Sequence, residues 1–389
     1  MSKKVKKLVP ELRFSEFKDD WKEKILTELA NVQTGPFGSQ LKNEQYITGG
    51  TPVVTVEHIK GFYICNFDYP SVTNEDRRRL RKYTLESGDI VFSRVGSVDL
   101  SACVEDYQEG WLFSSRMLRV RLNKQLKSKF VSYFLQQTKV RRYIIRISVG
   151  STMPSLNTEI LQSLPIRYST LEEQEKIASF LDTIALRINQ LRRKHELLET
   201  YKKGVMQKIF SQQIRFKQDD GKPFPDWEKK KLGELLTIRY GKDHKDLEDG
   251  KYPVLGTGGV MRYVNSYLYD KPSILIGRKG TIDRPRFVTF PFWTVDTLFY
   301  SEIKPNIIPF FLFLIVQSIN WYKYNEATGV PSLNTTSINS VKIHIPSEKK
   351  EQEKIANFIT SIDKKIDAVG VQIEKLEEFK KGLLQKMFV

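Results

Sequence analysis

The sequence is poor in the residues and segments on which several protein classes depend. It contains two cysteines, Cys65 and Cys103, in separate contexts, and four scattered histidines. This supply favours neither a disulfide framework nor a zinc site, and it is typical of a cytoplasmic chain. The longest apolar run, Ile307 to Val316, has ten residues including a proline. It predicts a buried core helix that is too short to span a membrane.

Motifs for nucleotide and methyl-donor chemistry are also missing. The chain has no GxxxxGK(S/T) phosphate loop, no glycine fingerprint leading from a strand into a helix, and no (N/D/S)PP(Y/F) tetrad. The first absence argues against NTP hydrolysis, and the last argues against methyl transfer to an amino group. We therefore expect a non-catalytic chain and disfavour a fused enzyme.

The sequence has fewer acidic residues than basic residues. The 63 Lys and Arg residues outnumber the 46 Asp and Glu residues, which gives a net charge of +17 and a pI of about 9.5. This balance favours a polyanionic partner. A basic protein without such a partner is the alternative.

Three sequence blocks occur twice in the same order. PSLNT begins at Pro154 and at Pro331, an offset of 177 residues. EQEKIA begins at Glu173 and at Glu351, an offset of 178, and a KKGxxQKxF block closes each copy. A repeat held in register over this length indicates an internal duplication.

The EQEKIA blocks open two long segments in which apolar residues alternate at steps of four and three. This period over about five heptads predicts a coiled coil of two long helices, with two ordinary amphipathic surface helices as the alternative. Thr170 followed by Glu173 predicts a capping box at the first helix start. The predicted seam residues are Ile177, Leu181, Ile184, Ile188, Leu191, Leu198, Val205 and Ile209 in one helix, and Ile355, Ile359, Ile362, Ile366, Val369, Ile373, Leu376, Leu383 and Met387 in the other.

An arm precedes each globular segment. Trp21 and Gly35 in the first copy match Trp227 and Gly241 in the second at an offset of 206. The predicted fold is α+β, with two mixed α/β domains in tandem duplication and an antiparallel coiled coil. If the helices are antiparallel, the N-terminal arm lies beside the C-terminus of the second helix. The predicted divisions are 1–168 (arm and first domain), 169–210 (first helix), 211–346 (arm and second domain) and 347–389 (second helix).

The two globular segments share short strand patterns, but the loops between these strands differ in length. The offset falls from 206 to 201 at Pro52 and Pro253, to 184 at Ile90 and Ile274, to 180 where Phe113 is aligned with Trp293, and to 177 at PSLNT. A common scaffold with different loops suggests one recognition task performed on two targets.

The duplication also bears on catalysis, because a catalytic carboxylate should recur in both copies. In this alignment Asp89 matches Ser273, and Asp296 matches Arg116. Carboxylate catalysis is therefore not expected.

A basic residue in a tight turn does recur, because Arg94 with Gly96 matches Arg278 with Gly280 after an apolar strand. An arginine beside a close backbone approach can bind a phosphate or a guanine edge. A structural turn with a solvated arginine is the alternative. The loops that do not match are better candidates for reading bases: GPFGSQLK (Gly35 to Lys42), GKDHKD (Gly241 to Asp246) and TGGVMRY (Thr257 to Tyr263).

The order of arm, variable domain, PSLNT, EQEKIA helix, repeated once, resembles the specificity subunit of bacterial type I restriction-modification systems. The resemblance covers essentially the whole chain. It implies two target recognition domains, each reading in the major groove one half of a split, asymmetric sequence in double-stranded DNA. It also implies that the paired helices set the spacer and dock two modification (methyltransferase) subunits, which restriction (translocase and nuclease) subunits join.

On this resemblance S-adenosylmethionine, ATP and magnesium belong to the partner subunits, and no cofactor or metal is expected in this chain. The PSLNT loops are expected to brace each domain on its helix. A coiled-coil protein-binding scaffold without a DNA role is the competing hypothesis. The candidate DNA-binding residues are Ser39, Gln40, Lys42, Arg94, Ser97 and Arg116 in the first domain, and Lys242, His244, Arg262, Tyr263, Arg278, Lys279 and Thr281 in the second.

Overall fold

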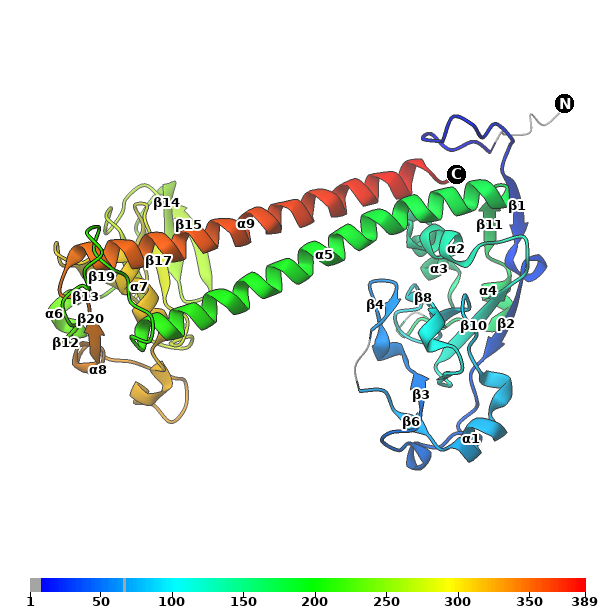
Figure 1. Cartoon of the computed structure of the whole chain (residues 1–389), viewed down its shortest axis with the longest axis horizontal. Helices are drawn as coiled ribbons and strands as arrows, with labels where there is room; N and C mark the ends of the chain where they lie inside the picture. The colour runs from blue at the N-terminus through cyan, green and yellow to red at the C-terminus, as the bar shows by residue number, and fades with distance from the viewer. Residues whose placement is uncertain (1–7, 66–67, 151) are drawn as a thin grey trace. The chain divides into compact units, whose positions relative to one another are not determined.

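The computed structural model describes residues 8–65, 68–150 and 152–389, and the chain divides into two compact units. Unit 1 comprises Met1–Arg192 and Val371–Val389, and unit 2 comprises Arg193–Gly370. The long helices α5 (Leu171–Phe210) and α9 (Lys349–Lys386) each pass from one unit into the other (Figure 1). The mixed helix and sheet content agrees with the predicted α+β class. The predicted domain divisions stay a prediction, because the units cut through both helices.

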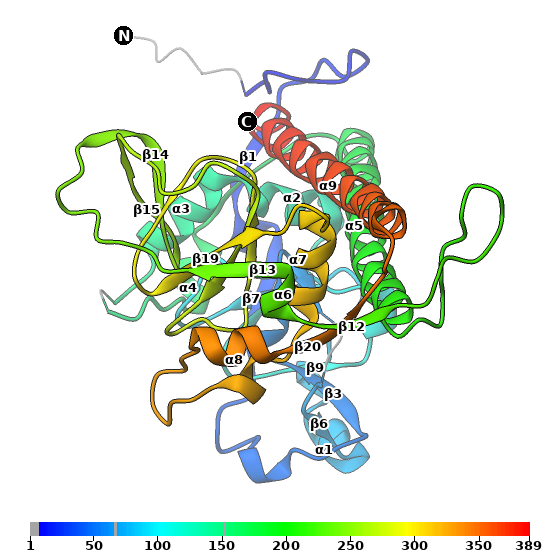
Figure 2. The same cartoon turned by 90° about the vertical axis from the view of Figure 1, so that its left-hand side faces the viewer.

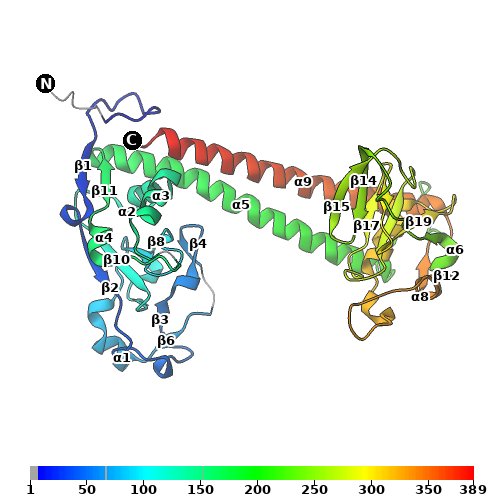
Figure 3. The same ribbon diagram turned by 180° about the vertical axis from the view of Figure 1, so that it is seen from behind.

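Unit 1 is built on an antiparallel sheet in the order β2-β10-β7-β8. A second sheet, β6-β3-β9, contains the parallel pair β3 and β9. Strand β1 pairs with β11 close to the start of α5 (Figure 3). The strands are β1 (Lys22–Ile25), β2 (Ala30–Thr34), β3 (Thr51–Val54), β4 (Ile59–Lys60), β5 (Tyr63–Ile64), β6 (Ser71–Val72), β7 (Ile90–Ser93), β8 (Ser101–Cys103), β9 (Leu112–Phe113), β10 (Met117–Leu122) and β11 (Pro165–Tyr168), and the helices are α1 (Asn74–Arg79), α2 (Ser128–Gln136), α3 (Thr138–Ile147) and α4 (Thr158–Gln162).

Unit 2 repeats this plan. Its antiparallel sheet has the order β13-β19-β16-β17, and its second sheet, β15-β14-β18, again contains one parallel pair, β14 and β18. Figure 2 shows α6, β13, β19 and α7 of this unit together. The strands are β12 (Glu228–Lys231), β13 (Leu236–Arg239), β14 (Asp249–Gly256), β15 (Gly259–Val264), β16 (Ser273–Gly277), β17 (Arg286–Val288), β18 (Trp293–Thr294), β19 (Leu298–Ile303) and β20 (Lys342–Ile345), and the helices are α6 (Leu232–Leu235), α7 (Pro309–Ser318) and α8 (Thr335–Ser340).

The strand pairing corrects the alignment of the two units by one residue. Val53 pairs with Leu112 in unit 1, and Val254 pairs with Trp293 in unit 2. The matching offset is therefore 181, so the alignment of Phe113 with Trp293 at 180 is wrong. Asp296 consequently matches Ser115, not Arg116.

The predicted antiparallel packing of the two long helices is confirmed. In unit 1 the beginning of α5 packs against the end of α9, where Leu181 and Leu383 share one hydrophobic core. In unit 2 the end of α5 packs against the beginning of α9, where Ile209 and Ile355 share another. The predicted buried helix at Ile307 to Val316 is also confirmed, because α7 buries most of its apolar side chains in the unit 2 core.

The recurrent Glu of EQEKIA holds the arm onto the helix. Glu173 is fully buried and accepts two hydrogen bonds from Arg13, at 2.7 and 2.8 Å. Glu351 accepts two from Arg215, at 3.2 and 2.9 Å. The predicted capping box is thus only half formed, because the Thr170 hydroxyl accepts from the Glu173 N–H at 3.4 Å while the carboxylate binds Arg13.

The recurrent Gln of the same motif links each helix to its globular part. Gln174 is buried, and its Oε1 accepts from the N–H of Lys127, the residue before α2, at 2.9 Å. Gln352 accepts from the N–H of Ile308, the residue before α7, at 3.0 Å. Each glutamine satisfies a backbone donor at a helix start that has no side-chain cap of its own.

The first arm closes onto the end of α9, as predicted. The Leu12 N–H donates to the Lys386 carbonyl at 2.8 Å. The matching contact in unit 2 joins the Ile214 N–H to the Lys208 carbonyl at 3.2 Å. In unit 2 the two residues belong to one continuous stretch of chain, whereas in unit 1 they come from opposite ends of the sequence.

Candidate functional site

The predicted arginine turn of unit 1 lies at the end of β7 and is held by backbone hydrogen bonds. The Arg94 N–H donates to the Arg116 carbonyl at 2.8 Å, and the Arg94 carbonyl accepts from the Leu156 N–H at 2.8 Å. Gly96 has a φ of 82° and donates to the Pro154 carbonyl at 2.8 Å. A side chain at Gly96 would be strained, because this φ favours glycine.

The arginine turn of unit 2 has the same geometry. The Arg278 N–H donates to the Thr297 carbonyl at 2.9 Å, and the Arg278 carbonyl accepts from the Leu333 N–H at 2.9 Å. Gly280 has a φ of 85° and donates to the Pro331 carbonyl at 2.9 Å. The duplication therefore preserves a three-dimensional feature as well as a sequence pattern.

These contacts add a role to the one expected for the PSLNT loops, whose bracing of each domain on its helix stays a prediction. Backbone hydrogen bonds join the loops to the arginine turns, and the side chains of Asn157 and Asn334 cap α4 and α8 at 2.8 and 2.7 Å. Gln174 and Gln352 link the domains to the long helices, as described above. The loops thus fix the orientation of each arginine turn.

A cavity of about 620 Å³ opens between three loops of unit 2, at residues 242–245, 256–261 and 295–297. The predicted residues Lys242 and His244 lie in its wall. The loop is fixed by its backbone, because the Lys242 N–H donates to the Thr294 carbonyl at 2.8 Å and its carbonyl accepts from Trp293 Nε1 at 3.0 Å. The Asp243 carboxylate accepts from the next two backbone N–H groups, and hydrogen bonding lowers its pKa.

Asp296 connects this cavity to the arginine turn. It lies in the cavity wall, and its Oδ2 is 3.9 Å from Arg278 Nη1. The same nitrogen donates to the Asp296 carbonyl at 3.3 Å, while the guanidinium lies over the Tyr240 ring at 5.5 Å from its centre. Sequence reasoning considered Asp296 only as a catalytic candidate and missed it as a neighbour of Arg278.

The predicted loop of unit 1 is fixed more by side chains. Gln40 Oε1 accepts from the Tyr83 hydroxyl at 2.6 Å, and the Gln40 carbonyl accepts from Arg79 at 2.6 Å. The Lys42 N–H donates to Gln45 Oε1 at 2.8 Å. Gln40 is therefore already engaged within the domain, whereas the side chains of Ser39 and Lys42 are exposed.

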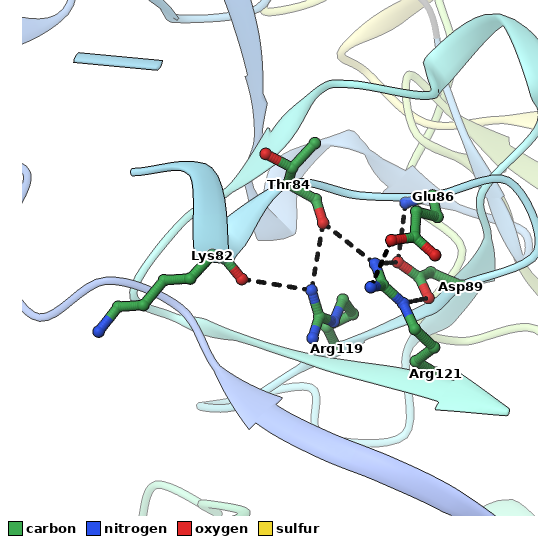
Figure 4. A network of polar contacts seen from close by, with 6 residues as sticks. All are labelled: Lys82, Thr84, Glu86, Asp89, Arg119 and Arg121. Atoms are coloured by element: carbon green, nitrogen blue, oxygen red, sulfur yellow. Dashed lines mark hydrogen bonds and ion pairs between the residues drawn. The ribbon is translucent and has the colours of Figure 1, made fainter. Parts of the chain in front are cut away.

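Two arginines of β10 serve the scaffold of unit 1 (Figure 4). Arg121 donates to both Asp89 oxygens, at 2.9 and 2.8 Å, and Arg119 donates to the Thr84 carbonyl at 3.1 Å. Burial and the neighbouring Arg121 lower the pKa of Arg119, whereas the hydrogen bond to Asp89 raises the pKa of Arg121. The buried Arg119 and the half-buried Arg121 thus hold β10 to the preceding loop.

The structure brings some predicted residues together and separates others. Arg94 meets Arg116 through the backbone, and Lys242 and His244 share one cavity. Arg262 lies instead on β15, where it binds Asp249 at 2.8 Å. Whether these residues contact DNA stays a prediction. Of the thirteen, Ser39, Lys42, Ser97, Arg116, Lys242, Tyr263 and Lys279 are exposed, and Gln40, Arg94, His244, Arg262, Arg278 and Thr281 are half-buried.

Comparison with known proteins decides the family. Residues 18–199 and 225–378 match the type I restriction modification DNA specificity domain. The chain belongs to this family. The resemblance seen in the repeated motifs is thereby confirmed.

Relatives and solved structures agree with this assignment. A Methanocaldococcus jannaschii protein provisionally named the MjaX type I restriction enzyme specificity subunit is 26% identical, with 95% of this chain and 93% of that protein covered. The MjaVIII specificity subunit of the same organism is 25% identical, with 87% and 88% covered. The crystal structure of a type I restriction-modification S subunit from M. genitalium has the same fold, with a TM-score of 0.62, 18% identity, and 98% and 99% covered.

The two family matches follow the duplication seen in the structure. Both family matches include one globular part and most of one long helix. Within the part of the chain that the structure describes, no helix is both long and apolar enough to cross a membrane.

Proposed function

We propose that this chain is the DNA-recognition subunit of a type I restriction-modification complex. Each unit reads one half of a bipartite, asymmetric site in the major groove of double-stranded DNA. The long helices set the spacer and dock two modification subunits, and restriction subunits join that assembly. The chain acts in the cytoplasm, where the DNA is.

One observation supports this proposal most directly. The arginine turns at Arg94 and Arg278 have matching backbone hydrogen bonds, while the loops beside them differ in length and residue type. A shared frame with different polar loops fits recognition of two different sequences. The excess of basic residues fits a polyanionic ligand.

The proposal assigns the chemistry to other subunits. S-adenosylmethionine would bind the modification subunits, and ATP and magnesium would bind the modification or restriction subunits. This chain carries no catalytic step in the proposal and contributes recognition and positioning.

A map of adenine methylation in the host genome, with and without the gene, tests the proposal. We expect a two-part motif that disappears on deletion. Exchange of residues 21–168 for the corresponding segment of another specificity subunit should then change one half of the motif. If the map is the same with and without the gene, and purified modification subunits do not bind the chain, the proposal fails.

The competing hypothesis is a protein-binding scaffold without a DNA role. Salt dependence separates the two, because a DNA reader that contacts several phosphates loses affinity steeply between low and moderate salt. Fluorescence anisotropy of a labelled duplex between about 50 and 200 mM salt should show at least a hundredfold loss for a DNA reader. A nearly flat response favours the scaffold.

A further inference from the structure

Asp296 is one of two exposed carboxylates in the wall of the unit 2 cavity. It lies in the turn between β18 and β19, and its side chain is 73% exposed. Arg278 points at the same turn, with Nη1 at 3.9 Å from Asp296 Oδ2. A hydrogen-bond acceptor in the cavity wall and a planar donor group therefore lie side by side.

The other wall residues suit the edge of a base better than a phosphate. Val260 and Met261 are more than half exposed and give the wall an apolar side. Lys242 and His244 give it a basic side. A site for phosphate alone gains nothing from a carboxylate, whereas base edges are read by mixed acceptors, donors and apolar contacts.

Asp243, the other carboxylate of the cavity, already has a structural role. It accepts from the backbone N–H groups of His244 and Lys245, at 2.7 and 3.1 Å. Asp296 contacts Arg278 only at 3.9 Å, which leaves its oxygens available to a ligand. The guanidinium lies over the Tyr240 ring, 5.5 Å from its centre, which favours its position beside Asp296.

We infer that this cavity reads a cytosine–guanine pair in the half-site of unit 2. Asp296 accepts a hydrogen bond from the N4 amino group of cytosine, and Arg278 donates to O6 and N7 of guanine. Thymine is rejected, because its O4 would face the carboxylate. This inference rests on the proposed DNA-reading function. It is specific to unit 2, because Ser115 occupies the matching position in unit 1.

Selection of bound duplexes from a randomised pool tests the inference with the full-length chain. The wild-type chain should prefer cytosine over thymine at one position of one half-site by about 5- to 150-fold, the range of one good base contact. In Asp296→Asn we expect this preference to fall below about threefold or to move towards adenine, which amide side chains bind. Asp296→Ala should abolish it, and the other half-site should be unchanged.

Asp219→Asn is the matched control, because Asp219 is an exposed carboxylate of unit 2 that pairs with Lys354 outside the cavity wall. It should leave every position unchanged. The inference is overturned if both Asp296 variants keep the cytosine preference, or if they lose enrichment equally at all positions. If the wild-type chain itself enriches no sequence, the proposed function fails and the inference falls with it.

Discussion

Each unit contains a junction between an arm and the end of a long helix. In unit 2 the arm continues covalently from that helix, whereas in unit 1 it does not. In unit 2, α5 continues through Ser211 into the arm at Ile214. In unit 1 the equivalent arm meets the end of α9, a segment of chain more than 370 residues away in sequence. Hydrogen bonds and packing therefore suffice to hold this junction, and chain continuity is not required for its geometry.

The globular parts of the two units, by contrast, share their strand pairing but differ in the side-chain contacts that support it. Unit 1 fixes β10 with charged groups, because Arg121 binds the buried Asp89. At the position of Asp89 unit 2 has Ser273, whose hydroxyl donates to the Ser301 carbonyl at 2.7 Å. The same strand position thus tolerates an ion pair or a hydroxyl contact. Strand pairing therefore sets the common backbone of the two units, and the side-chain contacts that support it differ between them.

The largest expected effect comes from weakening the junction that has no covalent support. Phe388 is buried, with its ring centre 6.0 Å from that of Trp21 and 5.1 Å from that of Phe130. Phe388→Ala should lower the free energy of unfolding by about 3–5 kcal/mol, because a buried aromatic ring is lost. Hydrogen exchange should show the loss of protection in unit 1.

Phe210→Ala is the matched control. Phe210 is half-buried, packs on Phe311 and is followed directly by the covalently connected arm. Its loss should be clearly smaller and should fall on unit 2. Equal losses in both variants would mean that connectivity contributes nothing to the strength of this junction.

A smaller effect is expected from the ion pair that the two units share. Glu173→Ala leaves Arg13, whose side chain is only 11% exposed, without its carboxylate, and should cost about 3 kcal/mol. Glu351→Ala should cost less, because Arg215 is 22% exposed and also contacts Asp226. Chemical denaturation measures both.

The double variant Arg13→Met with Glu173→Leu separates charge from packing. Replacing both members of a buried pair by apolar residues is often close to neutral. Most of the loss should therefore be recovered. A double variant as unstable as Glu173→Ala would show that the site needs the ion pair itself.

Much of the fold was predictable because the duplication repeats what packing requires. The heptads predicted both helices, and the repeated arm predicted the contact of Leu12 with the end of α9. The role of Glu173 was not predicted, because its partner Arg13 is 160 residues away. The signal was present, since an arginine follows Leu12 and Ile214 in both arms.

Other features depend on contacts that no local pattern contains. The chain breaks at Gln137 between α2 and α3 without a proline or glycine to mark the boundary. The alignment slipped by one residue at Phe113 because β9 and β18 have only two residues each, too few for a periodic pattern. The engagement of Gln40 by Tyr83 likewise spans 43 residues.

Removing the arginine side chain of either arginine turn should cost about as much binding free energy as one side-chain contact. Arg94→Ala and Arg278→Ala should each weaken binding of the cognate duplex by about 1–3 kcal/mol. If each reads bases, only its own half-site should lose selectivity. If Arg94 binds a phosphate, affinity should fall uniformly and the salt slope should decrease by about one. Titrations of duplexes with single substitutions in each half-site distinguish the two roles.

The smallest effect is expected at a lysine that occupies matching positions in α9 and α5 but has different neighbours in each. Lys380 of unit 1 interrupts the seam and lies 5.1 Å from the ring centre of Tyr133, while Lys202, its match in unit 2, binds Asp363 at 2.5 Å. Burial lowers the pKa of Lys380. The folded chain therefore binds fewer protons than the unfolded chain between that lowered pKa and about 10.4, the usual pKa of lysine.

The contribution of Lys380 to stability must consequently rise with pH across this window, because the unfolded state binds the extra proton. Lys380→Met removes a charge that is costly to bury, so it should raise the free energy of unfolding at neutral pH by about 1 kcal/mol or less. It should also remove the rise with pH. Lys202→Met breaks an ion pair and should lower stability instead. Urea denaturation of both variants between pH 7 and about 10.4 compares them, and a loss of stability in Lys380→Met would show that its contact with Tyr133 outweighs the cost of burial.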